Sequence, residues 1–203
     1  MPARKRPKQP SGDPKQRLIA AALTLAAAQG WRRIGMAEIA SAAGVSLTEA
    51  YGLVRSKPGI LAALRRQTDE TMLAGGAVSG DSPRDRLFDA LMRRFEALQP
   101  YRTGLRAVLR DSVGDPAMVG FLPGLLRSMS WTLTVAGLPA SGCRGQLARR
   151  LVGALYVSLL PTFFRDEGRD LGSTMAALDR RLRQVESLLS ALGPFLGADR
   201  ARS

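Results

Sequence analysis

The segment from Gly30 to Leu61 constrains the fold more than any other part of the chain, because its residues mark where two short helices end and begin. Gly44 can take the left-handed backbone conformation that ends a helix. Ser46 and Glu49 have the spacing of a capping box, in which the Ser hydroxyl accepts a hydrogen bond from the third backbone amide of a new helix. The segment therefore predicts two short helices joined by a tight turn.

The residues around this turn suit a close crossing of the two helices. Ala40 and Ala43 leave room for it, and Val45 is expected to pack back on the core. Such a unit can lay its second helix in the major groove of DNA. The distribution of charge agrees with a DNA partner. Residues 1–66 hold 12 Lys or Arg against 3 Asp or Glu, which gives +9 of the net charge of +13 for the whole chain. We expect the first third of the chain to bind a polyanion.

The rest of the chain also predicts helices, since apolar residues recur at helical spacing and strand signals are missing. Ser82 with Pro83 and Asp115 with Pro116 are helix starts. The expected helices cover residues 14–29, 37–43, 47–53, 57–75, 82–98, 101–113, 116–136, 145–166 and 173–193. The expected fold class is an all-α bundle. Its parts are a disordered basic arm at 1–13, a helix-turn-helix domain at 14–60 and a larger helical domain at 61–203.

Composition argues against an enzyme. The chain has no histidine, the commonest general base and metal ligand, and its single cysteine, Cys143, has no histidine to activate it. No zinc spacing, phosphate loop or nucleophile motif is present, so no catalytic residue, cofactor or metal is expected. A lone cysteine fits a reducing, cytoplasmic location.

A secretory signal is the alternative for the basic start and the apolar run 18–28. The prolines at its start and the helix pattern that follows argue against it. No stretch reaches the roughly 18 apolar residues that span a bilayer.

The turn segment resembles the DNA-binding domain of TetR-family regulators. That signature is Ile-Ala, two residues, Ala-Gly-Val-Ser, then a Tyr, a Ser-Lys pair and an aliphatic pair. The matching residues are Ile39, Ala40, Ala43, Gly44, Val45, Ser46, Tyr51, Ser56, Lys57, Ile60 and Leu61. The resemblance implies a bundle of nine or ten helices that acts as a dimer, with a ligand pocket in the C-terminal domain.

By position in this signature, several residues are expected to contact DNA. Those on the recognition helix are Leu47, Thr48, Ala50, Tyr51 and Gly52, and Lys57 is placed where the next helix start meets a phosphate. Tyr51 has an alternative as a core aromatic that braces this helix. Glu49 is interpreted as half of the capping box, with cytosine recognition as the alternative.

The sequence departs from the signature at several points. Gly35 stands where a threonine usually opens the second helix, Thr48 where the residue after the serine is glycine-like, and Val54 where an aromatic precedes the serine-lysine pair. Pro58 and Gly59 replace acidic residues. In the basic arm, Arg4, Lys5 and Arg6 are expected to enter the adjacent minor groove or to remain solvated.

The C-terminal domain holds many large apolar residues. An effector pocket would be apolar and is assigned to Phe88, Phe95, Phe121, Met129, Trp131 and Tyr156, with ordinary core packing as the alternative for each. It would suit a small hydrophobic or aromatic effector.

A homodimer is expected through the last two helices. Apolar residues there alternate spacings of three and four, with the interface assigned to Leu178, Leu182, Val185 and Leu189. Gly153 and Ala154 would let the preceding helix approach closely. The alternative is that this row faces the core of its own domain.

A second, looser resemblance starts at Leu87 and includes Arg127, Ser128, Met129 and Trp131. It is to the TetR-like accessory protein of ubiquinone biosynthesis, which handles lipid instead of DNA. The expected function is a ligand-responsive DNA-binding regulator, more often a repressor in this family, that acts on neighbouring genes through a pseudo-palindromic operator. The lipid-binding accessory protein is the alternative.

Overall fold

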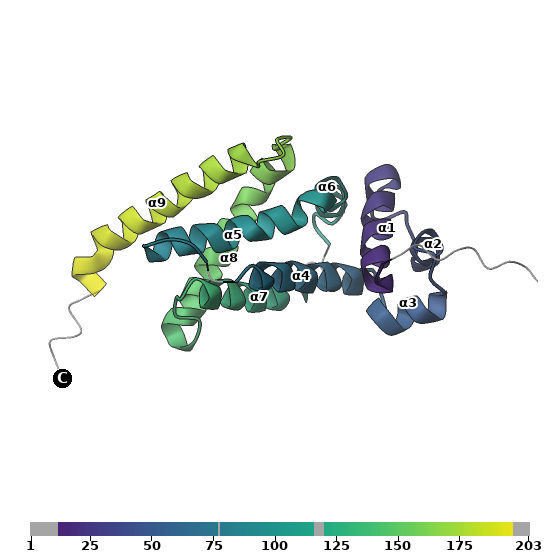
Figure 1. Cartoon of the computed structure of the whole chain (residues 1–203), viewed down its shortest axis with the longest axis horizontal. Helices are drawn as coiled ribbons and strands as arrows, with labels where there is room; N and C mark the ends of the chain where they lie inside the picture. The colour runs from purple at the N-terminus through teal and green to yellow at the C-terminus, as the bar shows by residue number, and fades with distance from the viewer. Residues whose placement is uncertain (1–11, 77, 116–119, 197–203) are drawn as a thin grey trace, which may run out of the picture. The chain divides into compact units, whose positions relative to one another are not determined.

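The computed structural model describes residues 12–76, 78–115 and 120–196, with 185–196 described by their backbone only. Regular structure in these residues is helical (Figure 1). The helices are α1 (Pro14–Gln29), α2 (Met36–Ala42), α3 (Leu47–Val54), α4 (Lys57–Ala74), α5 (Pro83–Leu98), the 3-10 helix η1 (Gln99–Tyr101), α6 (Arg102–Asp111), α7 (Leu122–Val135), α8 (Gly142–Arg165) and α9 (Gly172–Leu196). The predicted all-α class is confirmed.

The helices form two compact units whose division differs from the expected boundary after residue 60. The first unit comprises the described residues up to Gln67 together with those of Tyr101–Phe121, and the rest forms the second unit. Helix α6 therefore belongs with the helix-turn-helix, although it follows α5 in the chain. The two units are described separately below.

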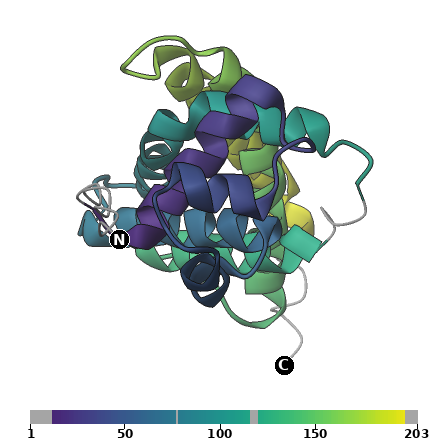
Figure 2. The same ribbon diagram turned by 90° about the vertical axis from the view of Figure 1, so that its right-hand side faces the viewer.

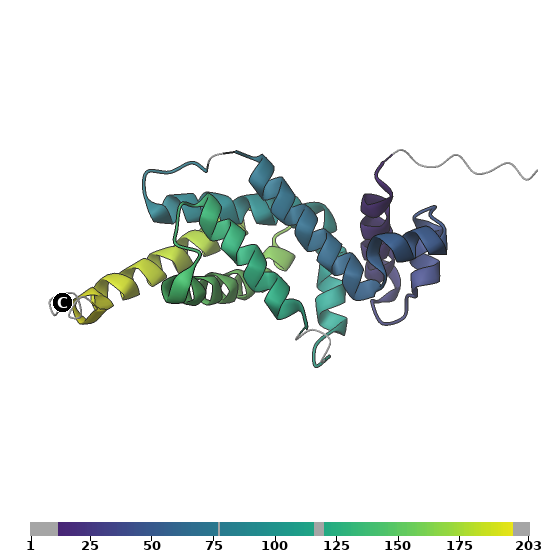
Figure 3. The same ribbon diagram turned by 90° about the horizontal axis from the view of Figure 1, so that it is seen from below.

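In the first unit, α1 lies between α6 on one side and α2 and α3 on the other (Figures 1 and 3). Its inward face carries the fully buried Leu18, Ile19 and Ala22. The close contact with α6 depends on Gly104, because a Cβ there would lie 2.3 Å from the backbone oxygen of Leu23. This glycine allows α6 to pack closely on α1.

In the second unit, α5 and α8 meet through aromatic rings. The Phe95 ring stacks on Tyr156 at 4.9 Å between centroids and lies 5.2 Å from Phe163. Beside this cluster, the guanidinium of Arg94 is buried and donates to Asp69 at 2.5 Å and to Ser128 at 2.7 Å. Helices α4, α5, α7 and α8 thus share a largely apolar core that contains one buried ion pair.

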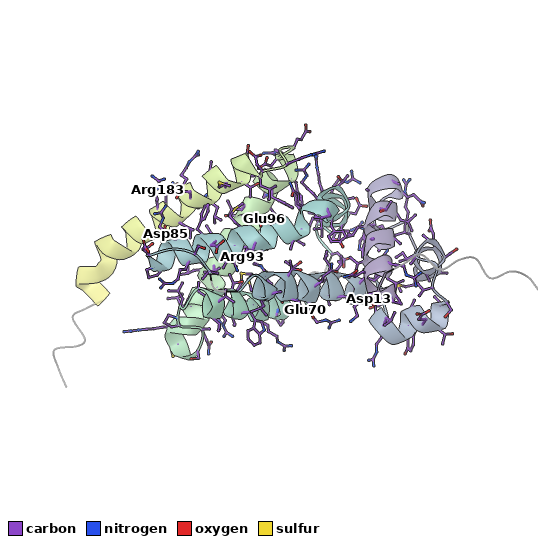
Figure 4. The ribbon with its side chains drawn as sticks, viewed as in Figure 1. Asp13, Glu70, Asp85, Arg93, Glu96 and Arg183 are labelled. Atoms are coloured by element: carbon purple, nitrogen blue, oxygen red, sulfur yellow. The ribbon has the colours of Figure 1, made fainter. Side chains whose placement is uncertain are left out.

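Local signals at helix starts are confirmed where the structure describes them. Ser82 caps α5, because its hydroxyl accepts from the Asp85 amide at 3.1 Å (Asp85 is labelled in Figure 4). The start expected at Asp115 and Pro116 adjoins residues outside the described part, and α7 begins at Leu122. At the start of α9, the buried Asp166 accepts from the Thr174 amide and hydroxyl at 2.7 and 2.8 Å.

Helix α8 is long and apolar enough to cross a membrane by length and composition, and 28% of its most apolar window is buried. It crosses α7 in Figure 3, where Gly153 lies against Met129 and Leu126 with room for a Cβ at ordinary van der Waals distance. Its other side exposes the apolar residues Leu147, Leu151 and Val157. One side of α8 thus packs inside its own unit, and the other is an exposed apolar surface.

Candidate nucleic-acid interface

The turn between α2 and α3 has the predicted geometry (Figure 2 shows this end of the first unit from the front). Gly44 has φ +64°, and the amide of Val45 donates to Ala40 at 3.0 Å. The Ser46 hydroxyl accepts from the Glu49 amide at 3.1 Å, which confirms the capping half of the predicted box. Ala40 and Ala43 are buried at the crossing. Local sequence therefore fixes the register of α3.

Helix α3 presents an exposed face that includes four of the five residues expected to contact DNA. Tyr51 is 66% exposed and Leu47 is 55% exposed, and Thr48 and Gly52 are exposed beside them. Tyr51 is therefore not the core aromatic of the alternative interpretation. A phosphate contact by Tyr51 stays a prediction.

Ala50 was wrongly assigned to this surface. Its exposed fraction is 0%, and with Val54, four residues later, it forms the buried side of α3. Residues four apart lie on the same face of a helix, so the two apolar residues face inward together. Ala50 seats the recognition helix on its own unit and cannot reach a base.

The ammonium of Lys57 has a structural role that the sequence did not reveal. It donates to the carbonyl oxygens of Trp31 at 2.5 Å and Ile34 at 3.0 Å, and it lies 4.7 Å from the centre of the Trp31 ring. Partial burial lowers the pKa of Lys57. Two donors of its ammonium thus hold the segment between α1 and α2, and the expected phosphate contact by Lys57 stays a prediction.

Asp111, at the end of α6, holds the same segment and was missed by sequence reasoning. Its Oδ2 accepts from the Trp31 amide at 2.7 Å, and its Oδ1 accepts from Arg110 at 3.0 Å. The hydrogen bond from Arg110 is the main cause that lowers the pKa of the Asp111 carboxyl, against desolvation, and the Trp31 amide adds to it. The segment that leads into α2 is thus fixed at Trp31 from both α6 and α4.

The first unit exposes arginines before α2 and after α3. Arg32 and Arg33 are exposed in the segment before α2, and Arg55 is exposed directly after α3. Arg4, Lys5 and Arg6, assigned to the minor groove, lie outside the described residues. The first unit therefore joins an exposed helix face to an excess of cationic side chains, which is the chemistry that DNA phosphates require.

The residues assigned to an effector pocket are not all gathered in one place. Phe95, Met129 and Tyr156 are buried in the second unit. Trp131 is 48% exposed, so its assignment to an enclosed pocket is corrected, and Phe121 is grouped with the first unit. Phe88 is partly exposed on α5.

The dimer assignment needs a similar correction. Leu178 and Leu182 are buried within the chain's own second unit, so the alternative that this row faces its own core holds for both. The side chains of Val185 and Leu189 lie outside the described part. The exposed apolar residues of α8 were missed as a row, although their spacing was visible in the sequence.

Among the described residues, no group of three or more His, Cys, Asp or Glu side chains could hold a metal ion. Cys143 is an exposed thiol.

Comparisons with solved structures identify the fold. A TetR transcriptional regulator from Nitrosomonas europaea ATCC 19718 matches with TM-score 0.68 and 21% identity over 85% of this chain and 98% of that one. A TetR regulator from Rhodococcus sp. RHA1 matches with TM-score 0.57 and 22% identity, over 82% and 94% of the two chains. A third, from Streptomyces coelicolor, has TM-score 0.51 and 21% identity, over 90% and 100%.

No family model matches the sequence, and no curated protein matches it. The chain has the fold of TetR transcriptional regulators.

Proposed function

We propose that this protein is a DNA-binding transcriptional regulator. The observation that carries the proposal is the exposed face of α3, where Thr48 and Tyr51 stand clear of the core on a helix whose register is fixed by the Gly44 turn and the Ser46 cap. The basic charge of residues 1–66 supports DNA as the partner. In this proposal the protein acts in the cytoplasm and carries out no catalysis.

The regulator acts as a homodimer. The exposed apolar residues Leu147 and Leu151 lie four apart on α8, and Ala154 and Val157 continue the exposed side by helical spacing. A second copy of the same helix, related by a two-fold axis, would cover these residues. The dimer would carry two copies of α3 to successive major grooves of a pseudo-palindrome, about 34–36 Å apart.

The dimer represses neighbouring genes, and a small effector controls it. This part rests on the resemblance to TetR regulators; the buried rings of Phe95, Tyr156 and Phe163 pack on one another, so an effector would have to separate them.

Fluorescence anisotropy with the DNA fragment upstream of the gene, and a scrambled fragment of the same composition, tests the proposal. The wild type should prefer the upstream fragment, and its affinity should fall steeply with salt, by roughly 0.9 in the log–log slope for each phosphate neutralised. Thr48→Ala should change the preference between sites, because this side chain can reach base edges. Ala50→Ser should not, because Ala50 faces the core; circular dichroism would verify that this variant is folded.

The lipid-binding accessory protein is the second candidate, favoured by the exposed apolar side of α8. Equal affinity for the two DNA fragments at physiological salt, together with co-purified isoprenoid or acyl lipid, would reject the regulator and support this candidate.

A further inference from the structure

The connection between α3 and α4 contains an unusual backbone conformation at Arg55. Its φ is +61° and its ψ is −36°, and Leu171 is the other non-glycine residue with positive φ in the described part of the chain. The amide of Ser56 donates to the carbonyl of Val54 at 2.7 Å, which closes a three-residue turn with Arg55 at its centre. A turn of this kind with positive central φ is rare and strained.

The residues on either side leave this turn little freedom. Val54 is buried, and the Ser56 hydroxyl caps α4 by accepting from the Gly59 amide at 3.2 Å. A Cβ on Gly59 would lie 1.7 Å from the Val54 oxygen, so the turn also explains why glycine replaces the acidic residue of the signature there. Position 55 must therefore keep a conformation that suits glycine best.

An arginine at such a position has a cost that its surroundings do not explain. Arg55 is exposed, and within the described part of the chain its side chain has neither a hydrogen bond nor an ion pair. Strained residues of this kind are retained mostly at functional sites, so the observed strain supports a hypothesis of function.

Its place in the first unit indicates the function. Arg55 directly follows the last residue of α3 and is exposed, so it lies at the C-terminal end of the helix that exposes Thr48 and Tyr51. The neighbouring cation, Lys57, is committed to the carbonyls of Trp31 and Ile34. Arg55 is therefore the exposed cation at this corner.

We propose that Arg55 binds a DNA phosphate at the C-terminal end of the recognition helix. The inference rests on the proposed DNA-binding function and assigns the backbone contact at this corner. The guanidinium suits a phosphate because its planar donors bind two oxygens at once.

The test compares Arg55→Gly, Arg55→Ala and Arg55→Lys with the wild-type protein. Arg55→Gly should raise the thermal unfolding midpoint by about 2–4 °C, since glycine relieves the strain. The same variant should bind the upstream DNA fragment about tenfold more weakly at physiological salt. Its log–log salt slope should decrease by roughly 0.9 for each subunit bound. Arg55→Ala should weaken binding equally without the gain in stability, and Arg55→Lys should retain most of the salt slope.

Arg66→Ala is the matched control, because Arg66 is an exposed arginine of the same unit within α4. It removes the same charge and should leave affinity and slope near wild type. A stable Arg55→Gly protein with wild-type affinity and slope, or a loss equal to that of Arg66→Ala, would overturn the inference.

The outcomes also separate this inference from the proposed function. Sequence-blind binding by the wild type, with the Arg55 loss present on both DNA fragments, would reject the regulator and keep the phosphate contact. Sequence-preferring binding that Arg55→Gly leaves unchanged would reject only the contact. Failure of the wild type to bind either fragment would overturn both.

Discussion

Asp69 and Arg94 show at the residue scale how one ion pair can govern the stability of an apolar core. The two side chains are 10% and 2% exposed, and Asp69 also accepts from the Ser128 hydroxyl. A buried pair adds little net stability when intact, but the removal of one partner leaves a charge without compensation. Removal of one partner should therefore change the free energy of unfolding by more than the intact pair contributes to it.

We expect Asp69→Ala to lower the free energy of unfolding by about 3–5 kcal/mol, because the Arg94 guanidinium would remain buried and charged. Glu70→Ala is the control, since Glu70 is the exposed neighbour on α4 (Figure 4) and should change stability by roughly 0.5 kcal/mol or less. Urea unfolding followed by circular dichroism would measure both. The double replacement Asp69→Leu with Arg94→Met should recover much of the loss; equal destabilisation by Asp69→Ala and Glu70→Ala would contradict the argument.

At the scale of elements, the sequence predicts the turns and helix caps that depend on residues close together in the chain. The Gly44 turn, the Ser46 cap and the Ser82 cap were predicted because each depends on residues within about one helical turn. The burial of Ala50 was also readable, since Ala50 and Val54 are both apolar and four apart. Position in the family signature predicts the opposite for Ala50, and the observed burial agrees with the apolar spacing.

Long-range partners could not be predicted in this way. Lys57 binds carbonyls 23 and 26 residues earlier, and Asp111 binds an amide 80 residues earlier. The assignment of α6 to the first unit depends on one glycine, Gly104, that fits against α1, and a helical glycine by itself does not indicate its partner. Tertiary packing decides such contacts, and the sequence pattern of a single helix does not show which distant residues it will meet.

The tie between α6 and the α1–α2 segment predicts a pH dependence of stability. The lowered pKa of Asp111 means that its carboxylate stabilises the fold fully above the ordinary carboxyl pKa of about 3.9. This contribution is lost as the pH falls through the lowered pKa. Asp111→Asn should therefore unfold at a lower temperature than wild type at pH 7, with a difference that narrows below about pH 4.

Hydrogen exchange would locate the effect of this change. The Trp31 amide, which donates to Asp111, should exchange faster in Asp111→Asn, whereas the Glu49 amide, held by Ser46, should not change. A difference between the two proteins that stays constant from pH 7 to pH 3 would show that the charge of Asp111 is not the cause.

For the whole molecule, the burial of Leu178 and Leu182 in the chain's own second unit decides where a dimer interface should be tested. A charge at Leu182 would enter the chain's own core and unfold the second unit, so loss of the dimer in that variant would not locate an interface. The exposed side of α8 offers a better site. Leu151 is 48% exposed in the single chain, so a polar residue there is tolerated by the monomer.

Leu151→Glu should therefore give a folded monomer. In a two-fold dimer each substitution occurs twice, and the two carboxylates would be placed in the contact between apolar surfaces, where an unpaired charge is costly. Analytical ultracentrifugation at micromolar concentration should show a dimer for the wild type and a monomer for the variant, with equal helix content by circular dichroism.

The variant should also lose most of its affinity for the upstream DNA fragment, because two linked recognition helices bind a pseudo-palindrome far more tightly than one. Gln146→Glu is the matched control, since this neighbour is exposed on α8 but polar in the wild type. A wild-type protein that sediments as a monomer, or a Leu151→Glu protein that stays dimeric, would exclude the α8 surface as the interface.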